Sequence, residues 1–138
     1  MGETFRAIRL FKTDAGQETR FVELTDDDLM DGDVTVRVAY STLNYKDGLA
    51  LTGRAPVVRV WPLTPGIDFA GLVESSSTPG LREGEAVVAN GWGLGETHHG
   101  GYAQKARVKP CASWALFICT LASLRSSGLF SATRRAQA

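Results

Sequence analysis

Residues 33–53, DVTVRVAYSTLNYKDGLALTG, contain the clearest structural pattern in the chain. From Val34 to Tyr40, three valines and the final tyrosine occupy alternate positions. This period of two predicts a strand with these four side chains on one face. From residue 41 to residue 52 the period changes, and leucines among helix-compatible residues predict a short helix after a polar turn.

Shorter elements are predicted on both sides of this segment. Upstream, strands at residues 4–11 and 21–24 flank an Ala15-Gly16 turn, and Phe5, Ile8 and Leu10 are expected to point inward. A capped helical turn is predicted at Thr25–Asp28 and a hairpin-type turn at Asp31-Gly32. Downstream, strands are predicted at 67–73, 86–89 and 102–108, separated by loops rich in Gly and Pro. Many short strands with one short helix predict a mainly β protein, either a small barrel or a sandwich.

Length and composition set limits on the class of protein. The 138 residues suit one domain, and the 15 basic and 15 acidic residues give a net charge of zero. A neutral chain argues against a partner bound by bulk charge, so we expect no nucleic acid and no membrane partner. No stretch reaches the ~18 apolar residues that span a bilayer, and the charged N-terminus differs from an export signal. These observations predict a cytoplasmic location.

The last part of the chain has a different composition. Glu96 is the last acidic residue, and residues 111–124 carry no charge before a tail rich in Ser and Arg. The sequence therefore predicts a domain at residues 1–109 and an atypical tail at 110–138. Two interpretations of the tail stay open: it is the product of a shifted reading frame, or it is a segment that docks on the domain.

Three segments look like functional motifs, but their residue spacing does not match a metal-binding or dinucleotide-binding pattern. The acidic run at residues 26–33 lacks the ligand pattern of an EF-hand and is interpreted as a solvated turn. His98 and His99 are neighbours whose side chains diverge, so no metal site is predicted there. The glycines at 91–95 lack the third glycine of a dinucleotide fingerprint.

A polar cluster follows the strongest predicted strand. It consists of Asn44, Tyr45, Lys46 and Asp47. Tyr can donate a hydrogen bond or a proton, Lys can increase its acidity, and Asn and Asp can orient a donor. From residue types alone, helix capping is the competing interpretation of this cluster.

Four segments in order resemble one family. They are SxLNYKDxLAxTG at 41–53, PGIDFAGxV at 65–73, GWGxGExHxGG at 91–101 and AxxARVK at 103–109. They are similar to the zinc-free branch of the medium-chain dehydrogenase/reductase superfamily, in the quinone-oxidoreductase-like group that includes bacterial NADPH-dependent acryloyl-CoA reductases.

The resemblance implies a GroES-like β-barrel with one or two short helices at residues 1–109. In the family this barrel is the catalytic half, it packs against a Rossmann domain that binds NADPH, and the full-length proteins are homodimers. No glycine-rich phosphate loop follows residue 109, so no Rossmann domain is expected within these 138 residues. Zinc-dependent relatives place a Cys where Asn44 stands and a His-Glu pair where Ile67-Asp68 stands, so no metal is expected.

The function implied by the resemblance is NADPH-dependent reduction of an activated C=C bond, in acryloyl-CoA or a similar enoyl thioester. An NADPH:quinone oxidoreductase is the alternative within the enzymes. A non-enzymatic truncated barrel or interaction module is the alternative of another class. The chain by itself is expected to be inactive.

The resemblance also assigns roles to individual residues. Tyr45 is expected to contact the nicotinamide end of NADPH, with Asn44 and Asp47 lining the same pocket. Tyr45 is also the first candidate either for the proton donor or for the residue that organises the donor. From their charge, and not from the resemblance, Lys46 and Arg59 are expected to bind a phosphate-bearing substrate such as a CoA thioester.

Overall fold

The computed structural model of the chain describes residues 3–109 and the backbone of residues 118–120. The elements in chain order are β1 (Phe5–Thr13), β2 (Gly16–Leu24), the 3-10 helix η1 (Asp26–Asp28), β3 (Val34–Tyr40), α1 (Tyr45–Thr52), β4 (Asp68–Ser76), β5 (Ala86–Asn90), β6 (Lys105–Val108) and β7 (Ile118–Thr120). The part of the chain that the structure describes has no helix long and apolar enough to cross a membrane.

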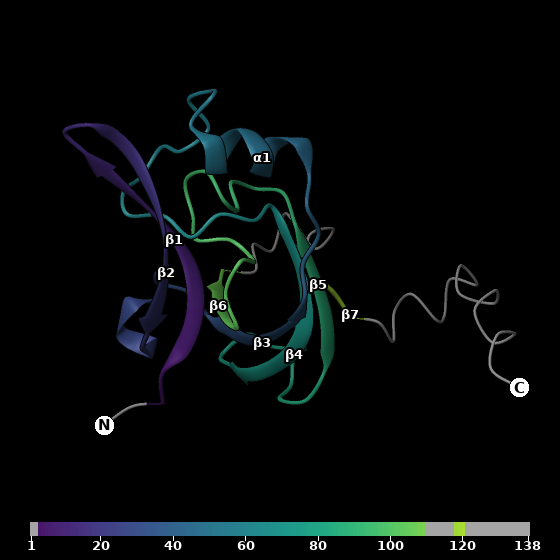
Figure 1. Cartoon of the computed structure of the whole chain (residues 1–138). Helices are drawn as coiled ribbons and strands as arrows, with labels where there is room; N and C mark the ends of the chain where they lie inside the picture. Colours follow the sequence, from purple (N-terminus) through teal and green to yellow (C-terminus); the bar gives the residue numbers. More distant parts are fainter. Residues whose placement is uncertain (1–2, 110–117, 121–138) are drawn as a thin grey trace, which may run out of the picture.

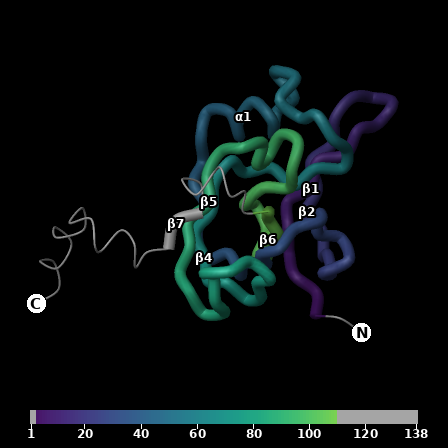
Figure 2. The backbone as a smooth tube through the Cα atoms, turned by 180° about the vertical axis from the view of Figure 1, so that it is seen from behind, coloured from purple at the N-terminus to yellow at the C-terminus, as the bar shows by residue number. Residues whose placement is uncertain are grey.

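The strands form two antiparallel sheets that enclose one interior (Figure 1). Five strands pair in the order β6-β3-β4-β5-β7, and β1 and β2 form a separate hairpin. The hairpin is joined to the rest of the barrel by backbone bonds, from Ile8 N–H to the Tyr102 carbonyl and from Leu10 N–H to the Leu63 carbonyl, each 2.8 Å. Helix α1 lies across one end of the barrel, as the view from behind also shows (Figure 2). The predicted fold class is confirmed.

The main core forms between the strands of the larger sheet. Its buried residues are Val34, Val36, Phe69, Val73, Val87, Ala89, Leu94, Ala106 and Val108. The predicted strand and its inward valines are confirmed as far as Val38, which is partly buried. The prediction for Tyr40 is wrong, because its side chain is 76% exposed. A register shift between Val38 and Tyr40 turns the end of β3 away from the core.

Two further predictions need correction. In β1, Phe5 and Leu10 are buried as expected, but Ile8 is only half-buried, and Arg9 is buried instead. Asp31-Gly32 makes no hairpin, because β2 and β3 lie in different sheets. Gly32 is needed there for close approach: a Cβ would stand 2.8 Å from the Val108 carbonyl oxygen.

The predicted helical elements are confirmed with their caps. In η1, Thr25 N–H donates to Asp28 Oδ2 at 2.8 Å and completes a capping box. Helix α1 begins after Asn44 and ends at Gly53, whose φ of 65° is the left-handed conformation common at helix C-termini. These local signals lie within a few residues of each other, which is why the sequence displays them.

Two loops cross with almost no side chains between them. Gly100 N–H donates to the Thr64 carbonyl at 2.8 Å, and Gly101 N–H donates to the Gly66 carbonyl at 3.0 Å. A Cβ on Gly100 would overlap the backbone oxygens of Pro65 and Gly66. The contact fixes the loop at 53–66 against the glycine-rich loop at 91–101, and both loops contribute to the site described next.

Candidate functional site

A buried carboxylate organises the start of α1. Asp47 is 1% exposed, and its Oδ1 accepts a hydrogen bond from Ile67 N–H at 3.0 Å. Its Oδ2 accepts from the backbone N–H of Asn44 at 2.9 Å and from Asn44 Nδ2 at 3.1 Å. Asp47 therefore joins the first turn of the helix to the segment that leads into β4.

A second carboxylate extends this cluster. Asp68 accepts hydrogen bonds from the Thr42 N–H at 2.9 Å, from the Thr42 hydroxyl at 2.5 Å and from Asn44 Nδ2 at 3.1 Å. Partial burial acts to raise the pKa of Asp68, but these hydrogen bonds outweigh it and hold the pKa below its ordinary value. Asp68 is therefore charged at neutral pH, and the amide of Asn44 bridges the two carboxylates.

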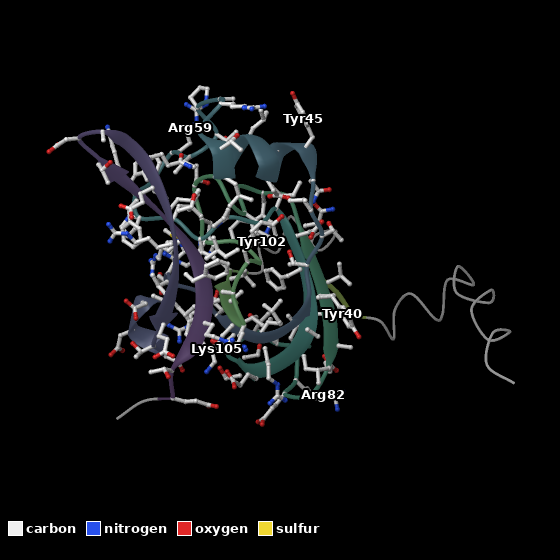
Figure 3. All side chains as sticks on the ribbon, viewed as in Figure 1. Tyr40, Tyr45, Arg59, Arg82, Tyr102 and Lys105 are labelled. Atoms are coloured by element: carbon white, nitrogen blue, oxygen red, sulfur yellow. The ribbon has the colours of Figure 1, made fainter. Side chains whose placement is uncertain are left out.

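The structure brings together two of the three residues expected in the catalytic pocket, Asn44 and Asp47, and directs the third, Tyr45, into solvent. Asn44 and Asp47 form a capping box that satisfies the free backbone N–H groups at the start of α1. Tyr45 is 85% exposed and projects from the end of the molecule where α1 lies (Figure 3). Its hydroxyl has no hydrogen-bond partner within residues 3–109. The cluster thus presents Tyr45 outward from a rigid base.

Tyr102 is part of this site and was not singled out from the sequence. Its hydroxyl donates to the Thr42 carbonyl at 3.0 Å. Burial first, and then the negative charge of Asp47, raise the pKa of Tyr102 above its ordinary value. It therefore stays protonated and remains a donor. Its position after a glycine pair carries no signal of this role, because Thr42 lies 60 residues away in the chain.

Lys46 and Arg59, the two residues expected to bind phosphate, each pair with the carboxylate of Glu96. Lys46 Nζ lies 2.5 Å from Glu96 Oε2, and Arg59 Nε lies 3.8 Å from Glu96 Oε1. Glu96 was not predicted as a site residue. The sequence placed it within a glycine-rich loop, but only the fold shows that it stands between the two cations.

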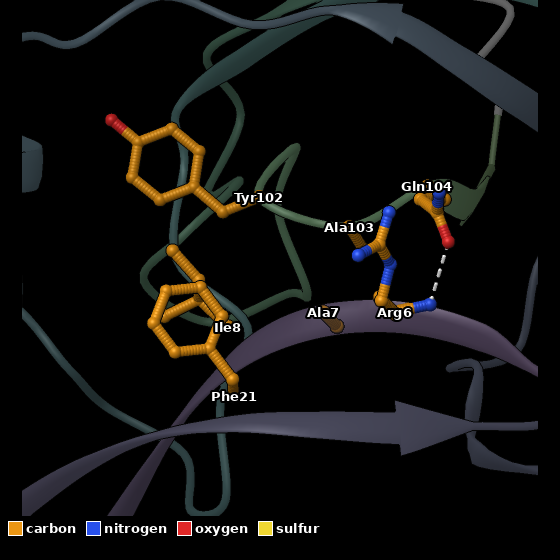
Figure 4. Close-up of a pocket in the computed structure, with 7 residues that line it drawn as sticks. All are labelled: Arg6, Ala7, Ile8, Phe21, Tyr102, Ala103 and Gln104. Atoms are coloured by element: carbon orange, nitrogen blue, oxygen red, sulfur yellow. Dashed lines mark hydrogen bonds between the residues drawn. The ribbon is translucent and has the colours of Figure 1, made fainter.

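Two shallow hollows lie beside the site on the barrel wall. One, of about 280 Å³, is lined by Arg6, Ala7, Ile8, Phe21, Tyr102, Ala103 and Gln104 (Figure 4). The other, of about 480 Å³, continues from it along the end of β3. The exposed rings of Phe21 and Tyr40 line them, so this wall is largely apolar.

The two histidines point to separate partners, as expected for neighbours. Because a guanidinium can only donate, Arg9 Nη2 donates to Nε2 of His99 at 2.6 Å. His98 Nε2 donates to the Arg107 carbonyl at 2.7 Å. Within residues 3–109, no three His, Cys, Asp or Glu side chains converge in a way that could hold a metal ion.

We expect the chain to lose stability as the pH falls from about 6.5 to 4. Burial, then the charges of Arg9 and His98, lower the pKa of His99 from 6.5 to about 4. Because the unfolded state binds this proton more readily, the contribution is complete above pH 6.5 and is lost on acidification. Burial also lowers the pKa of His98, with the same sign. The loss from His99 is about 2 kcal/mol after solvent screening.

Urea unfolding at a series of pH values measures this loss. The His99→Gln variant should remove the larger part of the slope between pH 6.5 and 4. The carboxylates with lowered pKa values, such as Asp28 and Asp68, act only at lower pH. An unchanged slope in His99→Gln would show that another group is responsible.

The chain is similar in sequence to one protein family and to several oxidoreductases. A family model described as the alcohol dehydrogenase GroES-like domain matches residues 30–138. The chain is 48% identical over 104 residues to "Probable acrylyl-CoA reductase AcuI" of Escherichia coli, covering 75% of this chain and 32% of that protein. It is 38% identical over 108 residues to "Putative quinone oxidoreductase YhfP" of Bacillus subtilis, covering 78% of this chain and 33% of that protein.

The fold is also similar to that of a solved oxidoreductase structure. The yhdH oxidoreductase from Salmonella enterica in complex with NADP is 43% identical and superposes with a TM-score of 0.77, over 84% of this chain and 34% of that one. The chain thus spans about a third of the length of the relatives it matches.

Proposed function

Because the chain belongs to the alcohol dehydrogenase GroES-like domain family, we propose that it forms the barrel of an oxidoreductase that uses NADPH to reduce the C=C bond of an enoyl thioester such as acryloyl-CoA. The similarity to the E. coli reductase supports the substrate class, and the NADP-bound Salmonella structure supports the cofactor. The observation that carries the proposal is the hydrogen-bonded cluster of Asn44, Asp47 and Asp68 at the start of α1, from which Tyr45 projects into solvent.

The same cluster supports a reaction without a metal. Zinc requires three or four convergent lone pairs from Cys, His or carboxylates. The side chain of Ile67 has no donor atom, and Asn44 uses its amide N–H groups on two carboxylates. The residues at these positions do not fit a zinc site.

The residues beside the cluster fit one end of a nicotinamide nucleotide. Tyr45 offers an exposed ring and a free hydroxyl, and Lys46 and Arg59 offer positive charge for phosphates. The nucleotide supplies a hydride when it is bound. Tyr45 would then donate a proton or hydrogen bond to the substrate, while Asn44 and Asp47 keep the helix start fixed so that this hydroxyl holds its position.

Reduction of a quinone is the second candidate. It is favoured by the similarity to the B. subtilis protein, whose name refers to quinone oxidoreductases. Quinones and enoyl thioesters are both electron-poor acceptors, so the same barrel could serve either one. If Lys46 and Arg59 bind the phosphates of the substrate and not those of the nucleotide, they favour the thioester, because CoA carries phosphates and a quinone does not.

A hybrid enzyme tests the proposal. Residues 3–109 of this chain replace the matching barrel of the E. coli relative, and NADPH oxidation is measured with acryloyl-CoA and with a quinone. We expect turnover with acryloyl-CoA, and a loss of about 100-fold in kcat for Tyr45→Phe, the size of a general-acid contribution. The chain alone is expected to show no turnover, since it spans only a third of its relatives.

Tyr40→Phe is the matched control, because Tyr40 is nearly as exposed as Tyr45 and lies outside the proposed machinery. Faster turnover with the quinone would favour the second candidate. A folded hybrid that binds NADPH and reduces neither acceptor would contradict the proposal and favour a non-enzymatic barrel.

A further inference from the structure

Glu96 lies between two cationic side chains from distant parts of the chain. Its carboxylate is 2.5 Å from Lys46 on α1 and 3.8 Å from Arg59 on the loop that precedes β4. The side chain of Glu96 is 27% exposed, against 45% for Lys46 and 59% for Arg59. The two cations therefore reach solvent, while the carboxylate between them is the most covered of the three.

The backbone holds this arrangement independently of the carboxylate. Arg59 N–H donates to the Glu96 carbonyl at 2.9 Å, and Glu96 N–H donates to the Gly93 carbonyl at 3.0 Å. A change of the Glu96 side chain leaves these bonds in place. The charge at this position can thus be altered without releasing the loop.

The three side chains carry a net charge of +1, and within residues 3–109 no second carboxylate pairs with either cation. Lys and Arg are the residues that bind phosphate. Figure 3 shows Arg59 and Tyr45 at the same end of the molecule. An anion that approaches this end meets two cations that already share one internal carboxylate.

We infer that Glu96 is an internal competitor for phosphate: it occupies the Lys46–Arg59 site in the free protein and sets the affinity for the phosphate groups of an adenosine-linked ligand. The inference rests on the proposed function, in which both CoA and NADPH carry such phosphates. A carboxylate this close repels an arriving phosphate and also satisfies the cations in its absence. Removal of its charge should strengthen binding.

Calorimetric titration of the full 138-residue chain tests the inference. The probes are CoA, dephospho-CoA, NADPH, NADH and inorganic pyrophosphate, at about 50 mM salt. We expect Glu96→Gln to bind the most tightly bound probe about fivefold more tightly than wild type, and Lys46→Ala to bind it about tenfold more weakly. The gain in Glu96→Gln should shrink at about 300 mM salt, because the added ions screen the charges.

Asp31→Asn is the matched control. It removes an equally short pair, Lys109 Nζ to Asp31 Oδ2 at 2.5 Å, which is more exposed and distant in sequence from α1. Its affinity for every probe should equal that of wild type. A stronger preference of Glu96→Gln for CoA over dephospho-CoA assigns the site to CoA, and a stronger preference for NADPH over NADH assigns it to the nucleotide cofactor.

Equal or weaker binding in Glu96→Gln overturns the inference, and so does the absence of binding by every probe to both proteins. The outcome is separate from that of the hybrid assay. Turnover by the hybrid with no gain in Glu96→Gln overturns only the role of Glu96. A gain in Glu96→Gln without turnover overturns only the proposed reaction.

Discussion

Replacement of Asp47 by alanine is expected to lower the free energy of unfolding by about 3 to 5 kcal/mol. The variant leaves the N–H groups of Ile67 and Asn44 without their buried acceptor. It also removes the link between α1 and the segment that leads into β4. Urea unfolding followed by circular dichroism measures the change.

Asp27→Ala is the control for Asp47→Ala, because Asp27 is an exposed carboxylate in η1. Its free energy of unfolding should stay within about 0.5 kcal/mol of wild type. Asp47→Asn should fall between the two, since an amide oxygen can replace only part of the acceptor capacity. A loss below 1 kcal/mol in Asp47→Ala would show that water satisfies these donors.

Replacement of Gly100 by alanine is expected to cost about 4 kcal/mol or more, or to prevent folding. The new Cβ would stand 2.7 Å from the Pro65 carbonyl oxygen and closer still to that of Gly66. Both obstacles are backbone atoms, so no side chain can rotate away. Thermal unfolding and the yield of folded protein measure the effect.

Gly48→Ala is the matched control with the opposite sign. Gly48 lies within α1, and a Cβ there has no heavy atom within 4 Å. The change should stabilise the protein by about 0.5 to 1 kcal/mol through helix propensity. A stable Gly100→Ala protein would mean that the loops at 53–66 and 91–101 can separate, and the crossing would then not fix the site.

The sequence predicted the strands and the helix, but it did not predict correctly which side chains in them are buried. The strand at residues 34–40 and the helix after it are confirmed, because alternation and capping are patterns of adjacent residues. Tyr40 was placed on the wrong face, since the register shift depends on pairing with β4. The burial of Arg9 was also missed, because its partner His99 lies 90 residues away in the chain.

Some residues of the candidate site could be found from the sequence, and others only from the structure. The cluster at residues 44–47 could be found from the sequence, because it occupies consecutive positions after a strong strand. The sequence also supplied Lys46 and Arg59 as a cationic pair. It could not supply Glu96 between them, nor Tyr102 beside Thr42, because sequence spacing carries no information on contacts across 50 or 60 residues.

The sequence by itself determined the strands, the capped helix, the barrel class and the family resemblance, because each depends on local periodicity or on a short motif. The tertiary structure alone decided which side chains meet: Asp47 with Ile67, Lys46 with Glu96, and Gly100 with the backbone of residues 65–66. The physical reason is that such contacts require the closure of long loops and one particular strand register. Both are set by the packing of the whole barrel.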